Sequence, residues 1–407
     1  MPQRRAYRRA LVIGGSMSGL LAALMLRRSG WQVDVFERAE AGLAGRGAGI
    51  VAQAELIARL GVLGLDTHDI GVSVKARKIF DDEGRLVASS VCPQVLTAWE
   101  RVYHLLRGAF PNAHYHPGRS FRALQQDDSG VIAYFSEGET ERADVLIGAD
   151  GLRSTVRQQF LPVVAPLYAG YVAWRALIAE SALPAQIHHD LFDALSFCLP
   201  PGEQFLGYPI AGPDDDLRPG RRRYNIVWYR PAEPVRELPW LLTDDNGVVH
   251  SISIPPPLIR CEAIATMREA AERLLAPQFR AIVRLIQEPL LQPIYDLESP
   301  RLAFDRVAVI GDAAFVARPH VAAGLSKAAD DAAALAAALE VDDIAGALRQ
   351  FEAERLPEGR KIVERARHLG AYLQATRNAE EQERSARHSI PLAVLTETAV
   401  LDFLYAS

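Results

Sequence analysis

Apolar and polar residues near the start of the chain follow the pattern of a strand, a helix and a second strand. Residues 10–13 form a short apolar run that ends at glycines, as a buried parallel strand does. Residues 18–29 are rich in Leu and Ala, which predicts a helix that ends at Gly30. Residues 31–36 alternate and include β-branched side chains, which predicts a second strand ending at Glu37. These segments predict a βαβ unit with a right-handed crossover.

The middle of the chain has a different pattern. Prolines are frequent between about 162 and 300, and short strand-like runs occur at 171–178, 224–229 and 248–254. Residues 259–287 carry apolar side chains at three- and four-residue spacing, which is typical of an amphipathic helix. This block predicts an antiparallel sheet with helices, inserted into the domain that the βαβ unit begins.

The pattern of the first domain returns after this block. Residues 306–310 predict a buried strand that leads into Gly311, and helices are expected at about 326–340 and 344–375. Residues 389–407 are apolar but too short and too acidic to span a bilayer, so we expect no membrane partner. They predict a docked helix or a contact in a homodimer.

The predicted fold class is therefore α/β, with a Rossmann-like domain, an inserted antiparallel-sheet domain and C-terminal helices. We assign residues 1–70, 95–165 and 300–375 to the first domain, 71–94 and 166–299 to the second, and 376–407 to a C-terminal helical extension.

Composition narrows the class of protein. The chain has 407 residues, 49% of them hydrophobic and 23% charged, which is typical of a globular protein, and this length predicts two domains or one large composite domain. Its net charge of -5 gives no electrostatic reason to expect nucleic acid as a partner. Cys92, Cys198 and Cys261 are far apart, so neither a disulfide framework nor a metal site is indicated. A cytoplasmic location fits this cysteine usage best.

Small residues follow the first predicted strand, where a dinucleotide-binding turn belongs. They are Gly14, Gly15, Ser16, Ser18 and Gly19. Glycine allows positive φ and a close approach of the backbone to a pyrophosphate, and the helix N-terminus supplies free N–H groups. Ser16 stands where the GxGxxG pattern has its middle glycine. Serine is small and can hydrogen-bond a phosphate, so we expect the site to persist.

Glu37 lies 23 positions after Gly14, where an acid can accept hydrogen bonds from both ribose hydroxyls. The alternative is a glycine-rich turn and a surface glutamate in an ordinary α/β fold. The order of strand, turn, helix, strand and acid favours the dinucleotide fingerprint. This motif alone does not separate FAD from NAD.

Two more acids follow predicted buried strands. Asp150 ends the run that begins at Asp144, and Asp312 ends the run that begins at Arg306. Acids at the carboxyl ends of parallel strands can converge on one extended cofactor. Either residue alone could instead be a turn aspartate.

Together these motifs resemble the single-component, class A flavoprotein aromatic hydroxylases. The resemblance runs from about residue 11 to residue 367, and its most specific segment is 318–331. It also includes the segments 14–19, 46–51, 150–151, 168–175, 208–210 and 311–314.

The resemblance implies that FAD is bound along these segments. The turn of residues 14–19 would hold the pyrophosphate, and Glu37 and Arg38 would lie at the adenosine ribose. Gly47, Ala48, Gly49 and Ile50 would run along the flavin, and Pro319 would lie in a loop facing it. Arg101 would reach the phosphate or ribityl chain, Asp312 would hold the ribityl chain, and Asp150 is linked with both FAD and NAD(P)H. The N–H groups of Gly324, Leu325 and Ser326 suit the flavin N1–C2=O edge.

Two positions depart from the family pattern. Phe315 stands where many members have histidine, and residues 322–324 read Ala-Ala-Gly in place of Gly-Gln-Gly. A branch that acts on hydroxylated pyridines shares this kind of change. How the flavin carbonyl edge is hydrogen-bonded stays open.

The resemblance also implies a reaction. NADH or NADPH would reduce FAD, and O2 would form a flavin C4a-hydroperoxide whose distal oxygen attacks a small, electron-rich aromatic ring such as a hydroxypyridine or a phenol. The protein must then exclude water and hold the target carbon near the reactive oxygen.

His320 and Tyr208 are the candidates for contact with the substrate. An imidazole that titrates near neutrality could bind or deprotonate a ring hydroxyl. The alternatives are a loop histidine satisfied by the backbone and a half-buried strand tyrosine. Trp174 and Arg175 are interpreted as residues that shape the predicted sheet.

Two other functions stay open at this point. One is a flavin oxidase or reductase of the same fold without oxygen insertion, and the other is a non-catalytic FAD-binding protein. Hydroxylated product formed with one O2 consumed would select the hydroxylase, whereas stoichiometric H2O2 would favour the oxidase.

Overall fold

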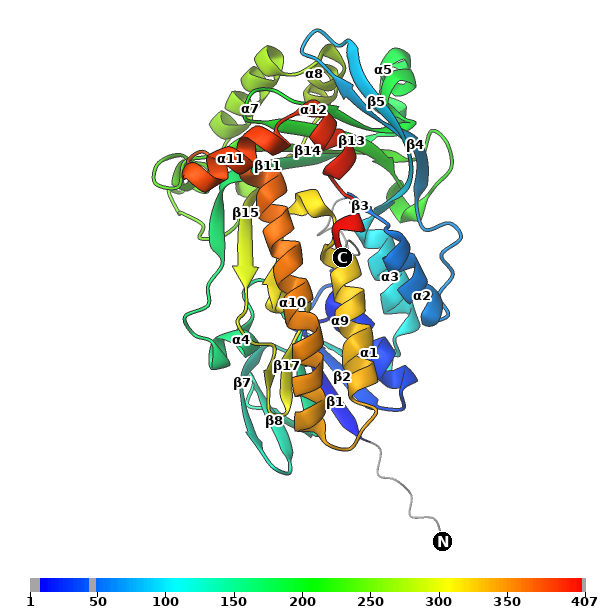
Figure 1. Cartoon of the computed structure of the whole chain (residues 1–407), viewed down its shortest axis with the longest axis vertical. Coiled ribbons are helices and arrows are strands. Elements are labelled where there is room, and N and C mark those ends of the chain that lie inside the picture. The colour runs from blue at the N-terminus through cyan, green and yellow to red at the C-terminus, as the bar shows by residue number, and fades with distance from the viewer. Residues whose placement is uncertain (1–7, 44–48, 405–407) are drawn as a thin grey trace.

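A computed structural model describes residues 8–43 and 49–404 (Figure 1). The predicted βαβ unit is confirmed by β1 (Arg9–Ile13), α1 (Met17–Arg28) and β2 (Gln32–Glu37), with β1 and β2 paired in parallel. They belong to a six-stranded sheet. Its order is β16 (Ala303–Phe304), β17 (Val307–Val309), β10 (Val145–Gly148), β1, β2 and β6 (Tyr115–Pro117).

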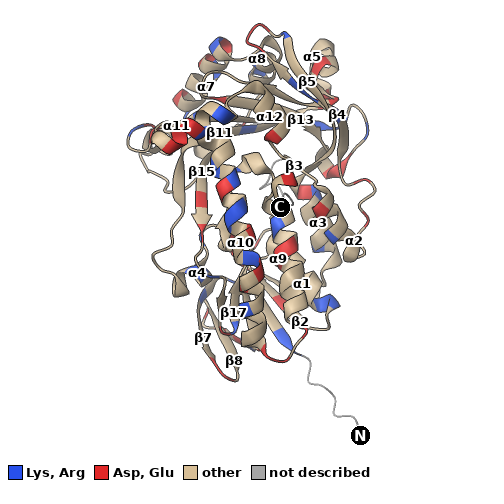
Figure 2. Cartoon of the chain, in the orientation of Figure 1, with Lys and Arg blue, Asp and Glu red and all other residues tan. Residues whose placement is uncertain are grey.

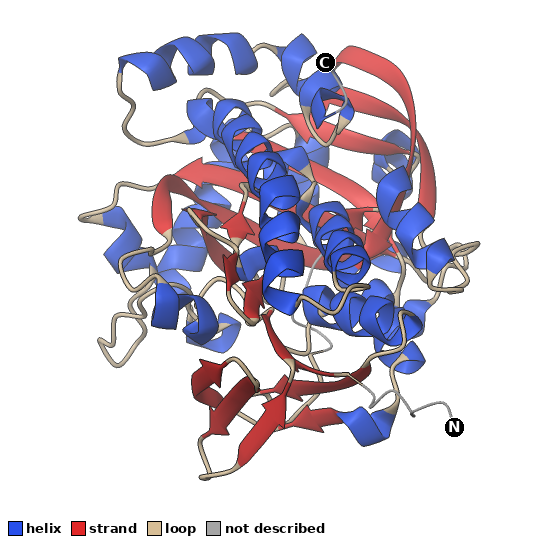
Figure 3. Cartoon of the chain, turned by 60° about the horizontal axis from the view of Figure 1, so that its bottom comes forward, coloured by secondary structure: helices blue, strands red, loops and turns tan. Residues whose placement is uncertain are grey.

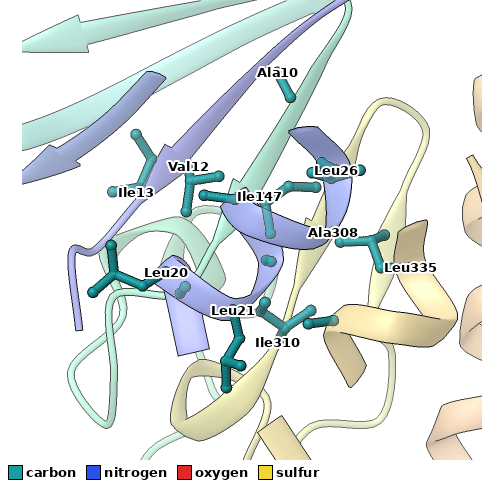
Figure 4. Packing of buried hydrophobic residues seen from close by; sticks show 14 of the residues in the cluster. Ala10, Val12, Ile13, Leu20, Leu21, Leu26, Ile147, Ala308, Ile310 and Leu335 are labelled. Carbon is teal, nitrogen blue, oxygen red and sulfur yellow. The ribbon is translucent and has the colours of Figure 1, made fainter. Parts of the chain in front are cut away.

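Strands β1, β10 and β17 are neighbours in this sheet and run parallel. Parallel strands end at the same edge, so the loops that follow them lie side by side. Helices α1 and α9 (Gly324–Ala338) pack against each other over this sheet. Figure 4 shows Leu21 of α1 close to Ile310, with Leu335 of α9 beside Ala308.

A second sheet has nine strands, two of which, at its edges, come from residues assigned above to the first domain. Its order is β18 (Phe315–Val316), β15 (Leu290–Glu298), β11 (Leu167–Ala179), β14 (Arg223–Pro231), β13 (Gln204–Ile210), β12 (Ala194–Cys198), β4 (Val72–Phe80), β5 (Leu86–Ala98) and β3 (Gly49–Val51). Only the β12–β4 pair is parallel among the pairings of this sheet that the structure describes. The α/β fold with an inserted, largely antiparallel sheet is thereby confirmed.

The structure also describes a small third sheet and further helices. A three-stranded sheet contains β7 (Phe121–Asp127), β8 (Gly130–Phe135) and β9 (Thr140–Ala143). The other helices are α2 (Ala54–Val62), α3 (Trp99–Ala109), α4 (Thr155–Phe160), α5 (Ala185–Leu191), α6 (Glu237–Leu241), α7 (Cys261–Leu274), α8 (Pro277–Arg284), α10 (Ile344–Gly370), α11 (Ala379–His388) and α12 (Pro391–Glu397). The strands and helices can be followed from a second side in Figure 3.

Two expectations for the inserted domain are wrong. Residues 248–254 form no strand, because Asp244 closes a turn by accepting from the N–H groups of Asn246 and Val248. The single helix expected at 259–287 is two helices, α7 and α8. Pro277 begins α8, because proline suits the first turn of a helix but cannot continue one.

The C-terminal segment is docked on its own chain, which is one of the two alternatives predicted for it. Val394 and Leu395 of α12 are buried against the nine-stranded sheet. The buried Arg77 of β4 donates to the carbonyl oxygens of Leu395 (2.8 Å) and Thr398 (2.7 Å). Among residues 8–43 and 49–404, no helix is long and apolar enough to cross a membrane.

Figure 2 shows Lys and Arg positions (blue) and Asp and Glu positions (red) interspersed along the elements in view, α10 included.

Candidate active site

The loops after β1, β10 and β17 contact one another. Gly14 follows β1 with φ +108°, and a Cβ there would overlap the carbonyl of Ala149 after β10. Gly311 follows β17 with φ +58°, and a Cβ there would overlap the hydroxyl of Ser18 in α1. Glycine is therefore required at both positions. The structure brings the three predicted loops together at one edge of the sheet.

The turn before α1 leaves room for an anion. A Cβ on Gly15 would overlap the Tyr115 hydroxyl, and one on Gly19 would overlap the Gly14 carbonyl, so backbone approaches backbone closely here. Ser16 is the N-cap of α1, and its side chain makes no capping hydrogen bond. The first helical hydrogen bond of α1 runs from Leu20 N to Ser16 O. The preceding N–H groups lack acceptors within the helix, so a pyrophosphate can accept from them.

Glu37 fastens this turn to the end of β2. Its Oε2 accepts from Gly15 N (2.8 Å) and its Oε1 accepts from Ala39 N (2.9 Å). The side chain is only 7% exposed, yet it lines a pocket. Each carboxylate oxygen can accept a further hydrogen bond, so a ribose hydroxyl can still bind to Glu37.

That pocket has a volume of about 430 Å³. Its lining includes Gly14, Ser16, Glu37, Arg38, Asp150 and Arg153. The predicted pyrophosphate turn, the predicted ribose acid and the loop after β10 therefore share one cavity. Arg101 does not line this pocket; its Nη1 donates to the carbonyl of Asp215 (2.7 Å).

The Asp150 carboxylate is engaged within its own loop. It accepts from the Ser154 hydroxyl and from the backbone N–H groups of Thr155 (2.7 Å) and Val156 (3.2 Å) at the start of α4. Burial raises the pKa of Asp150, and these hydrogen bonds oppose the rise. The side chain thus has the local role of a turn aspartate, and its cofactor contact stays a prediction.

A buried ion pair holds the third loop. Lys327 Nζ of α9 donates to Gly311 O (3.1 Å), and Asp331 Oδ2 accepts from Gly311 N (3.2 Å). The two side chains also bind each other at 2.8 Å, and Lys327 is only 3% exposed. The next residue, Asp312, is exposed, yet burial raises its pKa and Lys327 lowers it. Its contact with a ribityl chain stays a prediction.

We expect Lys327→Met to weaken FAD binding about tenfold, because it removes the donor that fixes the Gly311 carbonyl beside Asp312. The dissociation constant, measured by adding FAD to the stripped protein and following flavin fluorescence, checks this. Lys361→Met, on the exposed part of α10, is the control. Equal FAD affinity in both variants would contradict the role given to Lys327.

The N-terminus of α9 presents free N–H groups to the same region. Its first helical hydrogen bond runs from Lys327 N to Ala323 O (2.8 Å), so the N–H groups of Gly324, Leu325 and Ser326 have no helical acceptor. Pro319 begins the short 3-10 turn before this helix, and Ala322 adopts the left-handed conformation with φ +50°. The departure at Phe315 has a packing reason. Its ring fills the space that Gly359 of α10 leaves open.

His320 is buried among aromatic rings. Its side chain is 3% exposed, its Nε2 lies 2.9 Å from the Tyr171 hydroxyl, and its ring meets the Tyr229 ring at 4.4 Å. Burial, with the cations Arg318 and Arg175, lowers the pKa of His320 to about 3. This differs from the titration near neutrality expected from the sequence, because burial and the two cations disfavour the protonated imidazole. Its Nδ1 has no hydrogen-bond partner within the described part of the chain.

This pKa has a consequence for stability. Below the unperturbed pKa of 6.5 the unfolded chain binds a proton at His320 that the folded protein does not. The neutral, buried imidazole therefore contributes fully to the free energy of unfolding above that pH, and this contribution is lost as the pH falls toward 3. Between about pH 7 and about pH 5.5 the wild type should lose about 1 kcal/mol more unfolding free energy than His320→Gln. Urea unfolding at both pH values measures the difference; identical losses would contradict the burial of a neutral imidazole.

Tyr208 lies beside the segment expected to follow the flavin. A Cβ on Gly49 would come within 2.5 Å of the Tyr208 ring, and Gly49 N donates to Asn225 Oδ1 (3.1 Å). Burial raises the pKa of Tyr208, so it stays a neutral phenol. Ile50 pairs with Thr97 in the β3–β5 ladder, while Gly47 and Ala48 lie outside the described residues.

Comparisons with known sequences agree with this geometry. The family described as FAD binding domain matches residues 8–189, and one described as FAD binding domain-like matches residues 168–296. A 2,6-dihydroxypyridine 3-monooxygenase of Paenarthrobacter nicotinovorans is 34% identical over 373 residues, which cover 90% of this chain and 91% of that protein. A 6-hydroxynicotinate 3-monooxygenase of Bordetella bronchiseptica is 25% identical over 395 residues, covering 91% and 94%.

Solved structures give the same result. The 2,6-dihydroxypyridine-3-hydroxylase from Arthrobacter nicotinovorans matches with a TM-score of 0.85 at 32% identity, covering 91% of this chain and 93% of that chain. The Klebsiella pneumoniae protein HpxO, complexed with FAD and uric acid, matches with a TM-score of 0.73 at 22% identity, covering 96% and 97%. At that identity the second match shows the fold alone.

Proposed function

Because the chain belongs to the class A flavoprotein aromatic monooxygenases, we propose that its substrate is a small hydroxylated pyridine or a related phenol. It is an FAD-dependent enzyme that uses NAD(P)H and O2. In the balanced reaction one ring C–H becomes C–OH, O2 supplies that oxygen, and the second oxygen leaves as water. NAD(P)H and a proton supply the two electrons and the hydrogens of the water.

The residues of the first domain fit FAD. The glycine turn has the close packing against its own chain that a dinucleotide-binding turn requires, and the pocket beside it carries the Glu37 carboxylate. The N-termini of α1 and α9 offer N–H donors for a pyrophosphate and for negative charge on the flavin edge. Bound FAD would supply the transfer of electrons from NAD(P)H to O2.

Residues of the second domain, together with His320 of the first, would bind and orient the ring. Tyr208 lies beside Gly49, and the neutral His320 would offer Nδ1 as a hydrogen-bonding group. The Tyr171 hydroxyl fixes the orientation of the imidazole, and the Tyr229 ring packs against it. Aromatic walls of this kind exclude water and hold a planar ring in place.

The substrate proposal rests on one observation. The Tyr208 hydroxyl and the His320 imidazole are buried among aromatic rings, on the face of the nine-stranded sheet next to Gly49. Such a site suits a small planar ring with polar substituents. Relatives named for dihydroxypyridine and hydroxynicotinate support the same class. A cytoplasmic location is part of the proposal, since all three cysteines are free thiols.

A substrate screen tests this proposal. The purified holoenzyme is mixed with NADH or NADPH and a panel that begins with 2,6-dihydroxypyridine and includes monohydroxypyridines and phenols. We expect a hydroxypyridine to stimulate NAD(P)H oxidation, with one O2 consumed for each hydroxylated product. No stimulation by any hydroxypyridine or phenol of the panel, or H2O2 formed without a hydroxylated product, would contradict the proposal.

A further inference from the structure

We propose that the substrate binds in a deprotonated, anionic form and that the guanidinium of Arg175 is the cation that holds it. This inference rests on the proposed function and deepens it, because it names the charge state of the substrate and the residue that selects it.

The position of Arg175 in β11 places its side chain on the side of the sheet that carries the site. Alternate residues of a strand point to opposite faces. Tyr171 and Ala173 belong to the cluster that contains Tyr208 and Tyr229, whereas Val172 and Trp174 belong to the cluster with α7 and α8. By the same alternation, Arg175 lies on the face of Tyr171 and Ala173.

The strand register gives its neighbours on that face. Arg175 lies opposite Val227 of β14, and Val227 lies opposite Leu206 of β13. Two residues from Val227 along β14 are Asn225 and Tyr229, which share its face. Asn225 in turn lies opposite Tyr208. Arg175 is thus surrounded by the residues that border the predicted substrate site.

Arg175 lacks the kind of counter-ion that Arg318 and Arg230 have. Arg318 binds Asp296 at 2.9 Å and Arg230 binds Glu203 at 3.1 Å. Within the described part of the chain, Arg175 has no ion pair or hydrogen bond, and its Nε is buried without a partner. A partly buried cation without a counter-ion is costly, and an anionic ligand would remove that cost.

The charge of Arg175 already acts on the groups around it. It opposes the rise that burial causes in the pKa of Tyr208 and of Tyr229, and it helps to lower the pKa of His320. Arg318 also lowers the pKa of His320. A hydroxyl on a bound ring would experience the same field. A cation within about 4–6 Å lowers the pKa of an acid by about 1–3 units.

Other polar atoms near this face also lack a hydrogen-bond partner in the described residues. Asn225 Nδ2, His320 Nδ1 and the Tyr372 hydroxyl are buried without a hydrogen bond in the described residues. A buried polar atom without a partner is costly, and a ligand that hydrogen-bonds to it removes that cost. Together with Arg175 they suit a small aromatic anion that carries oxygen and nitrogen atoms, such as a hydroxypyridinolate.

The charge state of the bound ring decides how the ring is activated. A deprotonated ring hydroxyl makes the ring carbons electron-rich, as hydroxylation requires. His320 is too weak a base to remove this proton, and the nearby tyrosines keep theirs. The O–H bond of the substrate therefore breaks with its electron pair left on oxygen, and the proton goes to bulk water. Arg175 stabilises the resulting charge.

The test compares Arg175→Met and Arg175→Lys with wild-type holoenzyme. Binding of 2,6-dihydroxypyridine is followed through the flavin absorbance across pH, with 2,6-dimethoxypyridine as a neutral analogue. We expect Arg175→Met to bind the hydroxypyridine about tenfold more weakly, with the pH at which binding sets in moved upward. Arg175→Lys should retain most of the binding, and affinity for the neutral analogue should not change. Arg218→Met, which removes an exposed arginine, is the control.

A second measurement needs no variant. The ultraviolet spectrum of hydroxypyridine bound to the wild type should be that of the anion at a pH where the free compound is neutral, with a proton released on binding. A neutral spectrum, or equal loss of hydroxypyridine and analogue binding in Arg175→Met, would overturn the inference and leave the proposed function intact. A wild type whose flavin responds to no hydroxypyridine would overturn both.

Discussion

Gly19→Ala is expected to yield protein that carries almost no FAD. The new Cβ would overlap the carbonyl of Gly14, whose own φ of +108° only glycine adopts readily. The turn would have to move away from the N-terminus of α1, and overpacking of this kind costs roughly 1–3 kcal/mol or more. We expect FAD affinity to fall about a hundredfold, measured by flavin absorbance per protein and by titration of the stripped protein.

Gly61→Ala is the matched control, since Gly61 also lies in a helix, α2, but a Cβ there meets nothing within 4 Å. That variant should keep its FAD and gain slightly in stability, because alanine favours helix more than glycine does. Normal FAD content in Gly19→Ala would contradict the account of the turn.

His320→Ala should uncouple NAD(P)H oxidation from hydroxylation of the ring. Loss of the imidazole removes the wall between Tyr171 and Tyr229 and opens a cavity that water can enter. A ring held less firmly misses the reactive oxygen, and small misplacements cost about tenfold to a hundredfold in rate. Hydroxylated product per NAD(P)H should fall about tenfold or more, with H2O2 in its place and FAD content unchanged.

His68→Ala, which changes an exposed loop histidine, serves as the control for this variant. Coupled turnover at the wild-type level in His320→Ala would remove His320 from the site. Loss of FAD together with coupling would instead assign His320 to cofactor binding.

The βαβ unit and its glycine turn could be predicted from sequence because their determinants are local. Residues 10–37 combine hydrophobic periodicity with glycines whose missing side chains the structure requires at Gly14 and Gly19. The family itself was also recognisable, since the motifs 14–19, 150–151 and 311–314 end three strands that prove to be neighbours. The relative at 34% identity confirms that resemblance.

The pairing of the second sheet could not be predicted in this way. β4 and β12 are far apart in sequence and run parallel, and β3 and β18 contribute only a few residues each to the edges. No local pattern specifies such partners. The apparent strand at 248–254 shows the converse problem, because an alternating run became a turn closed by Asp244.

For the site, the sequence could indicate candidate residues but not how deeply they are buried or which charges surround them. His320 could be singled out as a candidate from the sequence, but its charge state depends on burial and on Arg318 and Arg175, which that pattern does not show. Lys327 was missed altogether. A lysine in an alanine-rich helix is usually solvated, and only the fold shows that it is buried against Gly311 and Asp331.

Product analysis under oxygen-18-labelled O2 tests the central claim most directly. The FAD-loaded enzyme, NAD(P)H and 2,6-dihydroxypyridine should yield a product with one additional hydroxyl whose oxygen is labelled, while labelled water should contribute none. A product without the label, or label found only in H2O2, would contradict the assignment of this chain as an aromatic monooxygenase.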